Sequence, residues 1–170
     1  MDLKAVIRNI PDFPAPGVQF KDITTLLKDG PAFSEMVGQL KESLAGKQVD
    51  VIVGPEARGF LFGAPLAYAL GVGFVLARKP GKLPAKTCRY EYALEYGTDA
   101  LELHEDAIAQ GTKVAVLDDL LATGGTAAAA CKLVESAGGE VVAVRFAIEL
   151  TDLGGRAALA GYDVGAIISY

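Results

Sequence analysis

The feature that most constrains the fold is a series of continuous apolar runs separated by segments with helical spacing. Such runs occur at Val49–Val53, Val72–Ala77, Lys113–Leu117, Glu140–Leu150 and Val164–Ser169. Strands that are buried on both faces have this character, whereas a strand with one wet face alternates apolar and polar residues. The pattern therefore predicts an α/β fold, a parallel sheet flanked by helices on both faces.

The ends of two predicted helices are marked by glycine. An apolar segment at Gly59–Leu70 precedes Gly71, and small or apolar residues at Ala127–Val134 precede the pair Gly138–Gly139. Glycine is common just after a helix because it adopts the left-handed conformation without penalty. The chain has 170 residues, 51% of them hydrophobic, and no linker or repeat. We therefore expect one domain over residues 1–170.

Two segments interrupt the alternation of strands and helices. Residues 11–24, PDFPAPGVQFKDIT, hold too many prolines for a helix and are called the hood. Residues 79–104 alternate around a turn at Tyr96–Asp99, which predicts a β-hairpin, called the flap. A long excursion from an α/β core is often a lid over a site, so we expect the flap to be flexible and to close over a ligand.

The charge balance and the chain's first residues limit the classes of partner. The chain carries 16 Lys and Arg against 21 Asp and Glu, a net charge of −5. Nucleic acid is not an expected partner, because proteins that bind duplexes normally present a basic face. The first ten residues lack the apolar region of a secretory signal, and no apolar run is long enough to span a bilayer. A cytoplasmic protein without a membrane partner is therefore expected.

The segment VAVLDDLLATGGT, Val114–Thr126, carries the sharpest chemical signal. Glycines and threonines after an apolar strand can present backbone amides and hydroxyl groups to a phosphate. The carboxylates of Asp118 and Asp119 would repel that phosphate unless the ligand offered them hydroxyl groups. A ribose 5-phosphate meets both requirements, because carboxylates accept strong hydrogen bonds from its diol.

Basic residues follow two other predicted strands, at the edge where ligands bind in open α/β sheets. Arg58 lies in GPEARG, and Arg78, Lys79 and Lys82 lie in RKPGK. Cations gathered at this edge suit a second anionic group such as pyrophosphate, with Mg²⁺ as its counterion. A ribose 5-phosphate that carries pyrophosphate is phosphoribosyl pyrophosphate.

The loop resembles the signature of the type I phosphoribosyltransferases, and its DDLLATGGT form is similar to that of the adenine phosphoribosyltransferases. Further segments match the same family in order: PDFPAPGVQFKDIT, EARGFLFG, RKPGKLP, LEYGTDALELH and IELTDLGGR. The matches run from Pro11 to Arg156. The resemblance implies the type I phosphoribosyltransferase fold, a homodimer and a role in purine salvage. In that reaction adenine and phosphoribosyl pyrophosphate give AMP and pyrophosphate, with Mg²⁺ as cofactor.

The resemblance also implies a role for each motif. The 5-phosphate and ribose would be bound by Asp118, Asp119, Ala122, Thr123, Gly124, Gly125 and Thr126, pyrophosphate by Glu56, Ala57, Arg58, Arg78, Lys79 and Lys82, and adenine by Gln19, Phe20, Lys21 and Leu150. Tyr96 would lie on the flap, and no protein group is expected to bind Mg²⁺ directly. The family also predicts a cis peptide bond between Glu56 and Ala57.

A carboxylate is the expected general base. Adenine must lose a proton as its nitrogen attacks the sugar, and a positioned side chain can accept it. Glu95 of the flap is the expected catalytic residue, because a closed flap would shield it from water and raise its pKa. Closure would also keep water from capturing the cationic sugar. Glu91 lies in the same hairpin and stays an alternative base.

Two other functions stay open. An enzyme of this fold can act on xanthine, hypoxanthine or guanine, although the hood and the LEYG segment weigh against that. Lys21 stands where the family often has Arg, and Gln19 is polar where many relatives are apolar, which leaves the base preference open. A regulator can keep the phosphoribosyl pyrophosphate loop, lack activity and bind nucleic acid. The acidic charge and the absence of a helix-turn-helix extension weigh against it.

Overall fold

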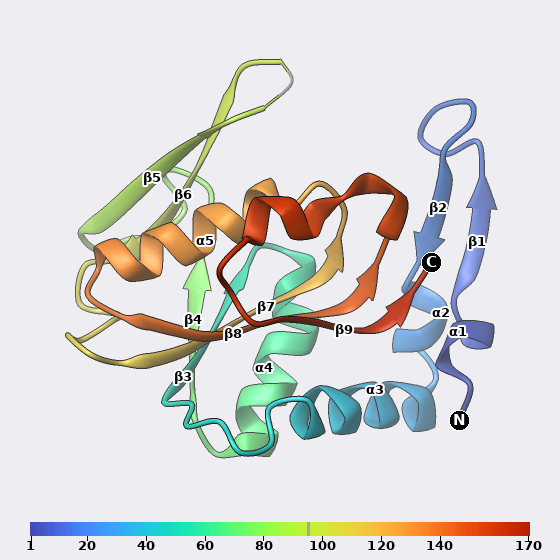
Figure 1. Cartoon of the computed structure of the whole chain (residues 1–170), viewed down its shortest axis with the longest axis horizontal. Helices are drawn as coiled ribbons and strands as arrows, with labels where there is room; N and C mark the ends of the chain where they lie inside the picture. Colours follow the sequence, from blue (N-terminus) through green and yellow to red (C-terminus); the bar gives the residue numbers. More distant parts are fainter. Residues whose placement is uncertain (95) are drawn as a thin grey trace.

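The structure is a computed structural model that describes residues 1–94 and 96–170. At its centre lies a five-stranded parallel sheet with the strand order β4-β3-β7-β8-β9 (Figure 1). The strands are β3 (Val51–Pro55), β4 (Gly73–Ala77), β7 (Lys113–Leu121), β8 (Glu140–Glu149) and β9 (Val164–Ser169). Each neighbouring pair is parallel. The predicted α/β fold is therefore confirmed.

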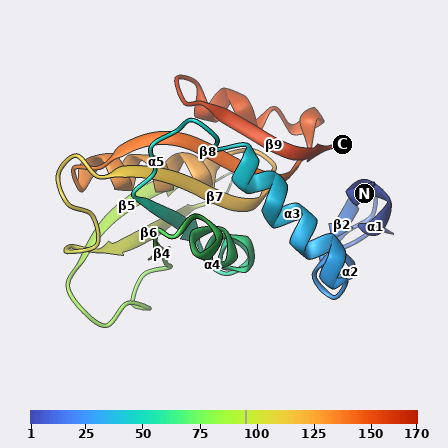
Figure 2. The same ribbon diagram turned by 90° about the horizontal axis from the view of Figure 1, so that it is seen from below.

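Helices cover both faces of the sheet. The helices α3 (Gly30–Glu42) and α4 (Arg58–Leu70) lie on one face (Figure 2), and α5 (Gly125–Ser136) lies on the other. Consecutive strand residues serve opposite faces, as the pleat of a strand requires. Ile52 belongs to the core cluster under α3 and α4, and Val53 belongs to the cluster under α5.

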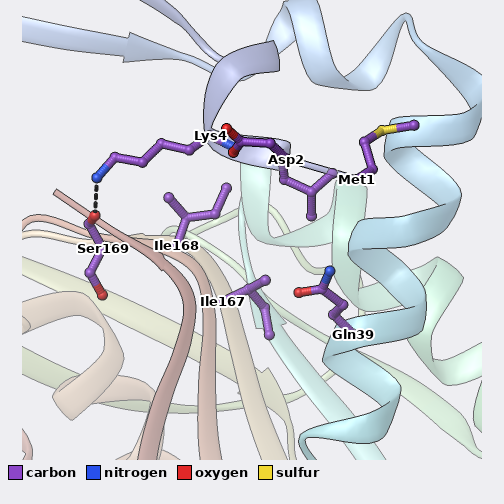
Figure 3. A pocket seen from close by; sticks show the side chains of 8 residues that line it. Met1, Asp2, Lys4, Gln39, Ile167, Ile168 and Ser169 are labelled. Carbon is purple, nitrogen blue, oxygen red and sulfur yellow. Dashed lines mark hydrogen bonds between the residues drawn. The ribbon is translucent and has the colours of Figure 1, made fainter.

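Short helices complete the chain. They are α1 (Leu3–Val6), α2 (Thr24–Leu27) and the 3₁₀ helices η1 (Thr151–Leu153) and η2 (Gly155–Leu159). From α1, the Nζ atom of Lys4 donates to the carbonyl oxygen of Ser169 at 2.8 Å (Figure 3). The N-terminal segment is therefore fixed to the last strand of the sheet.

Two antiparallel hairpins project on either side of the edge formed by the carboxyl ends of the strands (Figure 1). The first hairpin consists of β1 (Arg8–Pro11) and β2 (Gln19–Asp22), so it begins three residues before the hood and holds most of it, whereas the last residue of the hood, Thr24, is the first of α2. The second consists of β5 (Thr87–Ala93) and β6 (Thr98–His104) and is the hairpin predicted for the flap.

Strand β7 extends farther than its apolar run. The sequence predicts that the strand ends at Leu117, whereas β7 continues to Leu121 and contains Asp118 and Asp119. The extension forms because β8 continues to Glu149 and keeps pairing, with Asp118 opposite Phe146 and Leu121 opposite Glu149. The two carboxylates are therefore held by the sheet ladder rather than by a loop.

Two further observations concern the expected environment of the protein. In the described part of the chain, no helix combines the length and apolar character needed to cross a membrane. Cys88 and Cys131 are both free thiols. Burial raises the pKa of the Cys131 thiol to about 12, so this thiol stays protonated at neutral pH.

Candidate active site

The segment that joins β7 to α5 lines a pocket of about 210 Å³. All seven residues predicted to bind the 5-phosphate and ribose line it, and so does Arg58. Phe146 of β8 also lines it. The sequence analysis missed Phe146 because this residue reads only as part of an apolar strand.

Residues 122–126 form the phosphate loop, and its backbone conformation depends on glycine. Gly124 has a φ of 85°, in the left-handed region, and a Cβ atom there would lie 2.5 Å from the carbonyl oxygen of Gly155. Gly124 precedes α5 and has no side chain to cap it. Like the first amides of any α-helix, those of α5 have no intrahelical acceptors, and here no side chain of Gly124 caps them. They are therefore suited to an anion.

Asp118 and Asp119 share a single arginine in the pocket. Asp119 is 3% exposed, and its Oδ2 atom lies 3.0 Å from Nε of Arg58. Burial and the adjacent Asp119 carboxylate raise the pKa of Asp118 well above its usual range. A Cβ atom at Gly59 would lie 3.0 Å from Oδ1 of Asp118, so the glycine of the EARG motif makes room for this carboxylate. The two carboxylates therefore oppose each other's ionisation, and Arg58 is the basic side chain that lines the pocket with them.

Glu56 joins the two basic loops. Its Oε1 atom accepts a hydrogen bond from the Lys79 amide at 2.6 Å and lies 3.4 Å from Nε of Arg78. The peptide bond between Glu56 and Ala57 is cis, as the sequence analysis predicts. Nε of Arg78 is buried and has no hydrogen-bond partner among the described residues. The Arg78 guanidinium is therefore only partly satisfied by the protein.

The other two predicted pyrophosphate residues are placed differently. The Lys79 ammonium group forms an ion pair with Asp99 of β6 and lies 5.9 Å from the ring centroid of Tyr92. Burial opposes the charge on Lys79, but the interactions with Asp99 and Tyr92 together outweigh it and raise the pKa of Lys79. Lys82 is exposed. The structure therefore does not gather all four cations at one point.

A hollow of about 490 Å³ lies under the hood. Three of the residues predicted to bind adenine line it: Gln19, Lys21 and Leu150. Asn9 bridges two of them, because its Nδ2 donates to Oε1 of Gln19 at 2.6 Å and its Oδ1 accepts from Nζ of Lys21 at 2.9 Å. Nζ of Lys21 also lies 4.2 Å from the ring centroid of Tyr170. Two polar side chains of this hollow are therefore fixed in orientation.

Phe20, the fourth residue predicted to bind adenine, packs against another residue of the hood. Its ring packs edge-on against Phe13, with the ring centroids 5.2 Å apart, within the hood. Phe20 therefore stabilises the hood, and it is not among the residues that line the hollow.

Neighbouring residues line the pocket and the hollow. Leu121 lines the pocket, Leu150 lines the hollow, and the Leu150 amide donates to the Leu121 carbonyl oxygen at 2.9 Å. Both spaces therefore lie near the carboxyl ends of β7 and β8. A ligand that spans them can place an anionic group on the phosphate loop and a planar group under the hood.

Comparison with known proteins decides the family. The family described as the phosphoribosyl transferase domain matches residues 24–164. The chain belongs to the phosphoribosyltransferase family. The predicted family is therefore confirmed, and this phosphoribosyltransferase is an enzyme of the glycosyltransferase type.

The similar proteins are adenine phosphoribosyltransferases. The enzyme from Clostridium perfringens is 61% identical over 170 residues, which covers 100% of this chain and 99% of that protein. The enzyme from Alkaliphilus metalliredigens is 59% identical, with 100% of each chain covered. The crystal structure of the Thermoanaerobacter pseudethanolicus enzyme superposes with a TM-score of 0.97 at 58% identity and covers 99% of this chain and 98% of that one.

A more distant structure holds ligands. It is the Saccharomyces cerevisiae enzyme complexed with adenine and an imino-altritol bisphosphate. It superposes with a TM-score of 0.91 at 40% identity and covers 97% of this chain and 96% of that one.

The flap of this phosphoribosyltransferase carries the candidate bases. Glu95 lies outside the described residues. Glu91 is exposed and pairs with Arg89 at 2.7 Å. Tyr96, which the sequence analysis places on the flap, is 88% exposed. The base at this site therefore stays a prediction.

Proposed function

We propose that this phosphoribosyltransferase transfers the 5-phosphoribosyl group from phosphoribosyl pyrophosphate to adenine and releases AMP and pyrophosphate, a reaction of purine salvage. The observation that carries the proposal is that the phosphate-loop pocket and the hollow under the hood are lined by neighbouring residues, Leu121 and Leu150, which are joined by a backbone hydrogen bond. An AMP product needs such an arrangement, with a phosphate site and a base site on either side of a ribose site. Relatives that are 61% identical over their whole length carry the name of this activity.

The phosphate loop would bind the 5-phosphate, and the two aspartates would bind the ribose. The first amides of α5 and the hydroxyl groups of Thr123 and Thr126 supply donors for the phosphate. Arg58 pairs with Oδ2 of Asp119, which leaves lone pairs on the other carboxylate oxygens of Asp118 and Asp119 for the ribose diol. Their negative charge also stabilises the cationic sugar that forms as the bond to pyrophosphate breaks.

The basic loops would receive the pyrophosphate, with Mg²⁺ as the proposed cofactor. Bound Mg²⁺ would neutralise part of the charge of the leaving group. The site suits a Mg²⁺-bound substrate, because a nearby cation would offset the repulsion between the buried carboxylates of Asp118 and Asp119, which Arg58 alone faces in the pocket. Asp118 and Asp119 would face the Mg²⁺-bound substrate through its ribose, without direct protein ligation. Arg58 and the incompletely bonded Arg78 would contact the pyrophosphate, together with Glu56, Ala57, Lys79 and Lys82.

The hood would hold adenine. Gln19, Phe20, Lys21 and Leu150 are the proposed contacts, three of which line the hollow. Glu95, brought over the base by the flap, would accept the proton that adenine loses on attack, with Tyr96 beside it. The flap would exclude water from the cationic sugar at the same time.

One assay tests the proposed function. The protein is incubated with phosphoribosyl pyrophosphate, Mg²⁺ and, in turn, adenine, hypoxanthine, guanine and xanthine, and the nucleotide formed is identified. We expect AMP from adenine and far less nucleotide from the other bases. Nucleotide from another base but not from adenine would reassign the base. Binding of phosphoribosyl pyrophosphate without turnover of any base would support the inactive regulator instead.

We also propose that residues 1–170 form one domain, with the hood at 11–24 and the flap at 79–104, and that two copies form a homodimer in the cytoplasm. Strands of a single sheet serve both core clusters, which supports one domain. Large apolar side chains are exposed on α4 and on the edge strand β4, including Leu61, Tyr68 at 90% and Leu76. Such a surface suits a second copy of the chain. Light scattering should give twice the mass of one chain.

A further inference from the structure

The phosphate loop is backed by the 3₁₀ helix η2. A Cβ atom at Gly155 would lie 2.4 Å from the carbonyl oxygen of Ala122, and a Cβ atom at Gly124 would lie 2.5 Å from the carbonyl oxygen of Gly155. The backbone of η2 therefore packs directly against the backbone of the phosphate loop, with no room for a side-chain carbon between them. Because packed interiors transmit displacements, the position of the loop depends on the position of η2.

Arg156 fixes η2 to the sheet. Its Nε and Nη2 atoms donate to Oε1 and Oε2 of Glu149 at 2.8 and 2.7 Å, and its Nη1 atom donates to the carbonyl oxygen of Val164 at 2.9 Å. A guanidinium that makes two parallel bonds to a carboxylate is fixed in orientation as well as in distance. All three of its nitrogen atoms have protein acceptors, so its role is to hold η2.

Glu149, the carboxylate of this pair, lies beside the start of the phosphate loop. It is the last residue of β8, it is 5% exposed, and it stands opposite Leu121, the last residue of β7. The phosphate loop begins at Ala122, directly after Leu121. The ladder between β7 and β8 therefore fixes the loop at its start, and η2, held by Arg156, fixes it from behind.

We infer that Arg156 is a positioning residue whose pair with Glu149 holds residues 122–126 in the geometry that a 5-phosphate requires. The inference rests on the proposed function, because it assigns the pair to the 5-phosphate half of that site. Arg156 acts through the loop and does not touch the substrate. Since a displacement of about 1 Å at a binding site can cost about 100-fold in rate, such a residue has a measurable effect.

A second arginine–carboxylate pair on β8 provides a matched control. Nη2 of Arg145 donates to Oδ2 of Asp163 at 2.9 Å, and this pair also joins β8 to the chain that leads into β9. Asp163 precedes Val164, which pairs with Val144, toward the amino end of β8. Loss of this pair is expected to affect stability without moving the phosphate loop.

The experiment compares Arg156→Ala, Arg156→Lys and Asp163→Asn with the unsubstituted protein. Thermal unfolding, kcat and the KM values for phosphoribosyl pyrophosphate and adenine are measured for each, and AMP and adenine binding is followed by calorimetry. Arg156→Ala should raise the KM for phosphoribosyl pyrophosphate by about tenfold or more and leave the KM for adenine within about twofold. Arg156→Lys should give a smaller rise, because lysine keeps the charge but cannot make two parallel bonds. Asp163→Asn should leave both KM values unchanged.

The alternative is that the pair only stabilises the fold. This alternative is correct if Arg156→Ala and Asp163→Asn lower the unfolding temperature by the same amount and neither changes the KM for phosphoribosyl pyrophosphate. If Arg156→Ala does not fold, Arg156→Lys replaces it in the same comparison. If the unsubstituted protein does not turn over adenine, the proposed function fails and AMP affinity alone decides the inference. A tenfold loss of AMP affinity in Arg156→Ala but not in Asp163→Asn supports the inference. Equal AMP affinities in the two variants overturn it.

Discussion

The hood and the flap are both antiparallel hairpins beside the same edge of the sheet, yet they are held in different ways (Figure 1). The hood is held by contacts at its own base. Asp22 is 7% exposed, and its carboxylate accepts hydrogen bonds from Nε of Arg8 at 3.0 Å and from Oγ1 of Thr24 at 2.7 Å. The polar side chains of the hood therefore form hydrogen bonds mainly within their own hairpin and with Thr24, at the start of α2.

The flap is held by groups that belong to the site. The Tyr92 hydroxyl lies 3.5 Å from Oγ1 of Thr126 in the phosphate loop, and Asp99 pairs with Lys79 of the loop after β4. These two loops are the proposed sites of the 5-phosphate and pyrophosphate. The difference suggests separate roles, in which the hood is a preformed wall for the base and the flap responds to the occupied phosphate sites. Changes in the flap should therefore alter turnover, and changes in the hood should alter affinity for adenine.

The largest expected effect is that of Glu95→Gln in the flap. The substitution keeps the shape of the side chain and removes the proposed base, so kcat should fall by roughly 10²–10⁴-fold. Affinity for phosphoribosyl pyrophosphate should be unchanged, as checked by steady-state kinetics and direct binding. Glu91→Gln is the matched control and should keep kcat. Full activity of Glu95→Gln together with loss in Glu91→Gln would move the base to Glu91.

A smaller effect is expected from Gln19→Ala in the hood. The substitution removes one polar contact from the proposed base site, so the KM for adenine should rise roughly 2- to 12-fold, the equivalent of about 0.5–1.5 kcal/mol. The values of kcat and of the KM for phosphoribosyl pyrophosphate should stay the same. Gln48→Ala serves as the control, because Oε1 of Gln48 likewise accepts a side-chain hydrogen bond, from Nζ of Lys113, but Gln48 lies before β3, at the opposite end of the strands from the site. A change in kcat without a change in KM would mean that the hood and flap are not separate in function.

The smallest effect concerns the pH dependence of hood stability. Hydrogen bonds from Arg8 and Thr24 lower the pKa of Asp22 from 3.8 to about 2. Because the folded-state pKa is lowered, this stabilisation is present above pH 4 and is lost as the pH falls toward 2. The unfolding temperature of Asp22→Asn should therefore lie below that of the unsubstituted protein at pH 7, and the gap should narrow at pH 3. A gap that is constant with pH would show that the charge of Asp22 does not stabilise the hood.

The sequence predicts those parts of the fold and site that depend on local pattern. Apolar runs locate the five strands, and the glycine and threonine motif locates the phosphate pocket. Contacts between distant residues are not visible in this way. Nothing local indicates that Lys79 pairs with Asp99 instead of standing free, or that Arg156 reaches Glu149. The same limit explains the end of β7, because its last residues are strand only through their partners in β8.

The ladder that carries β7 through Leu121 also limits how this site can be redesigned. Insertions and deletions are usually tolerated in surface loops. In a strand, however, a shift of one residue turns every later side chain to the other face. Removing one residue from the first half of β7 would bring Asp119 to the place of Asp118 and separate the pair from Arg58. Engineering for a different sugar phosphate should therefore change loop length only after Leu121 and treat the two aspartates as part of a fixed frame.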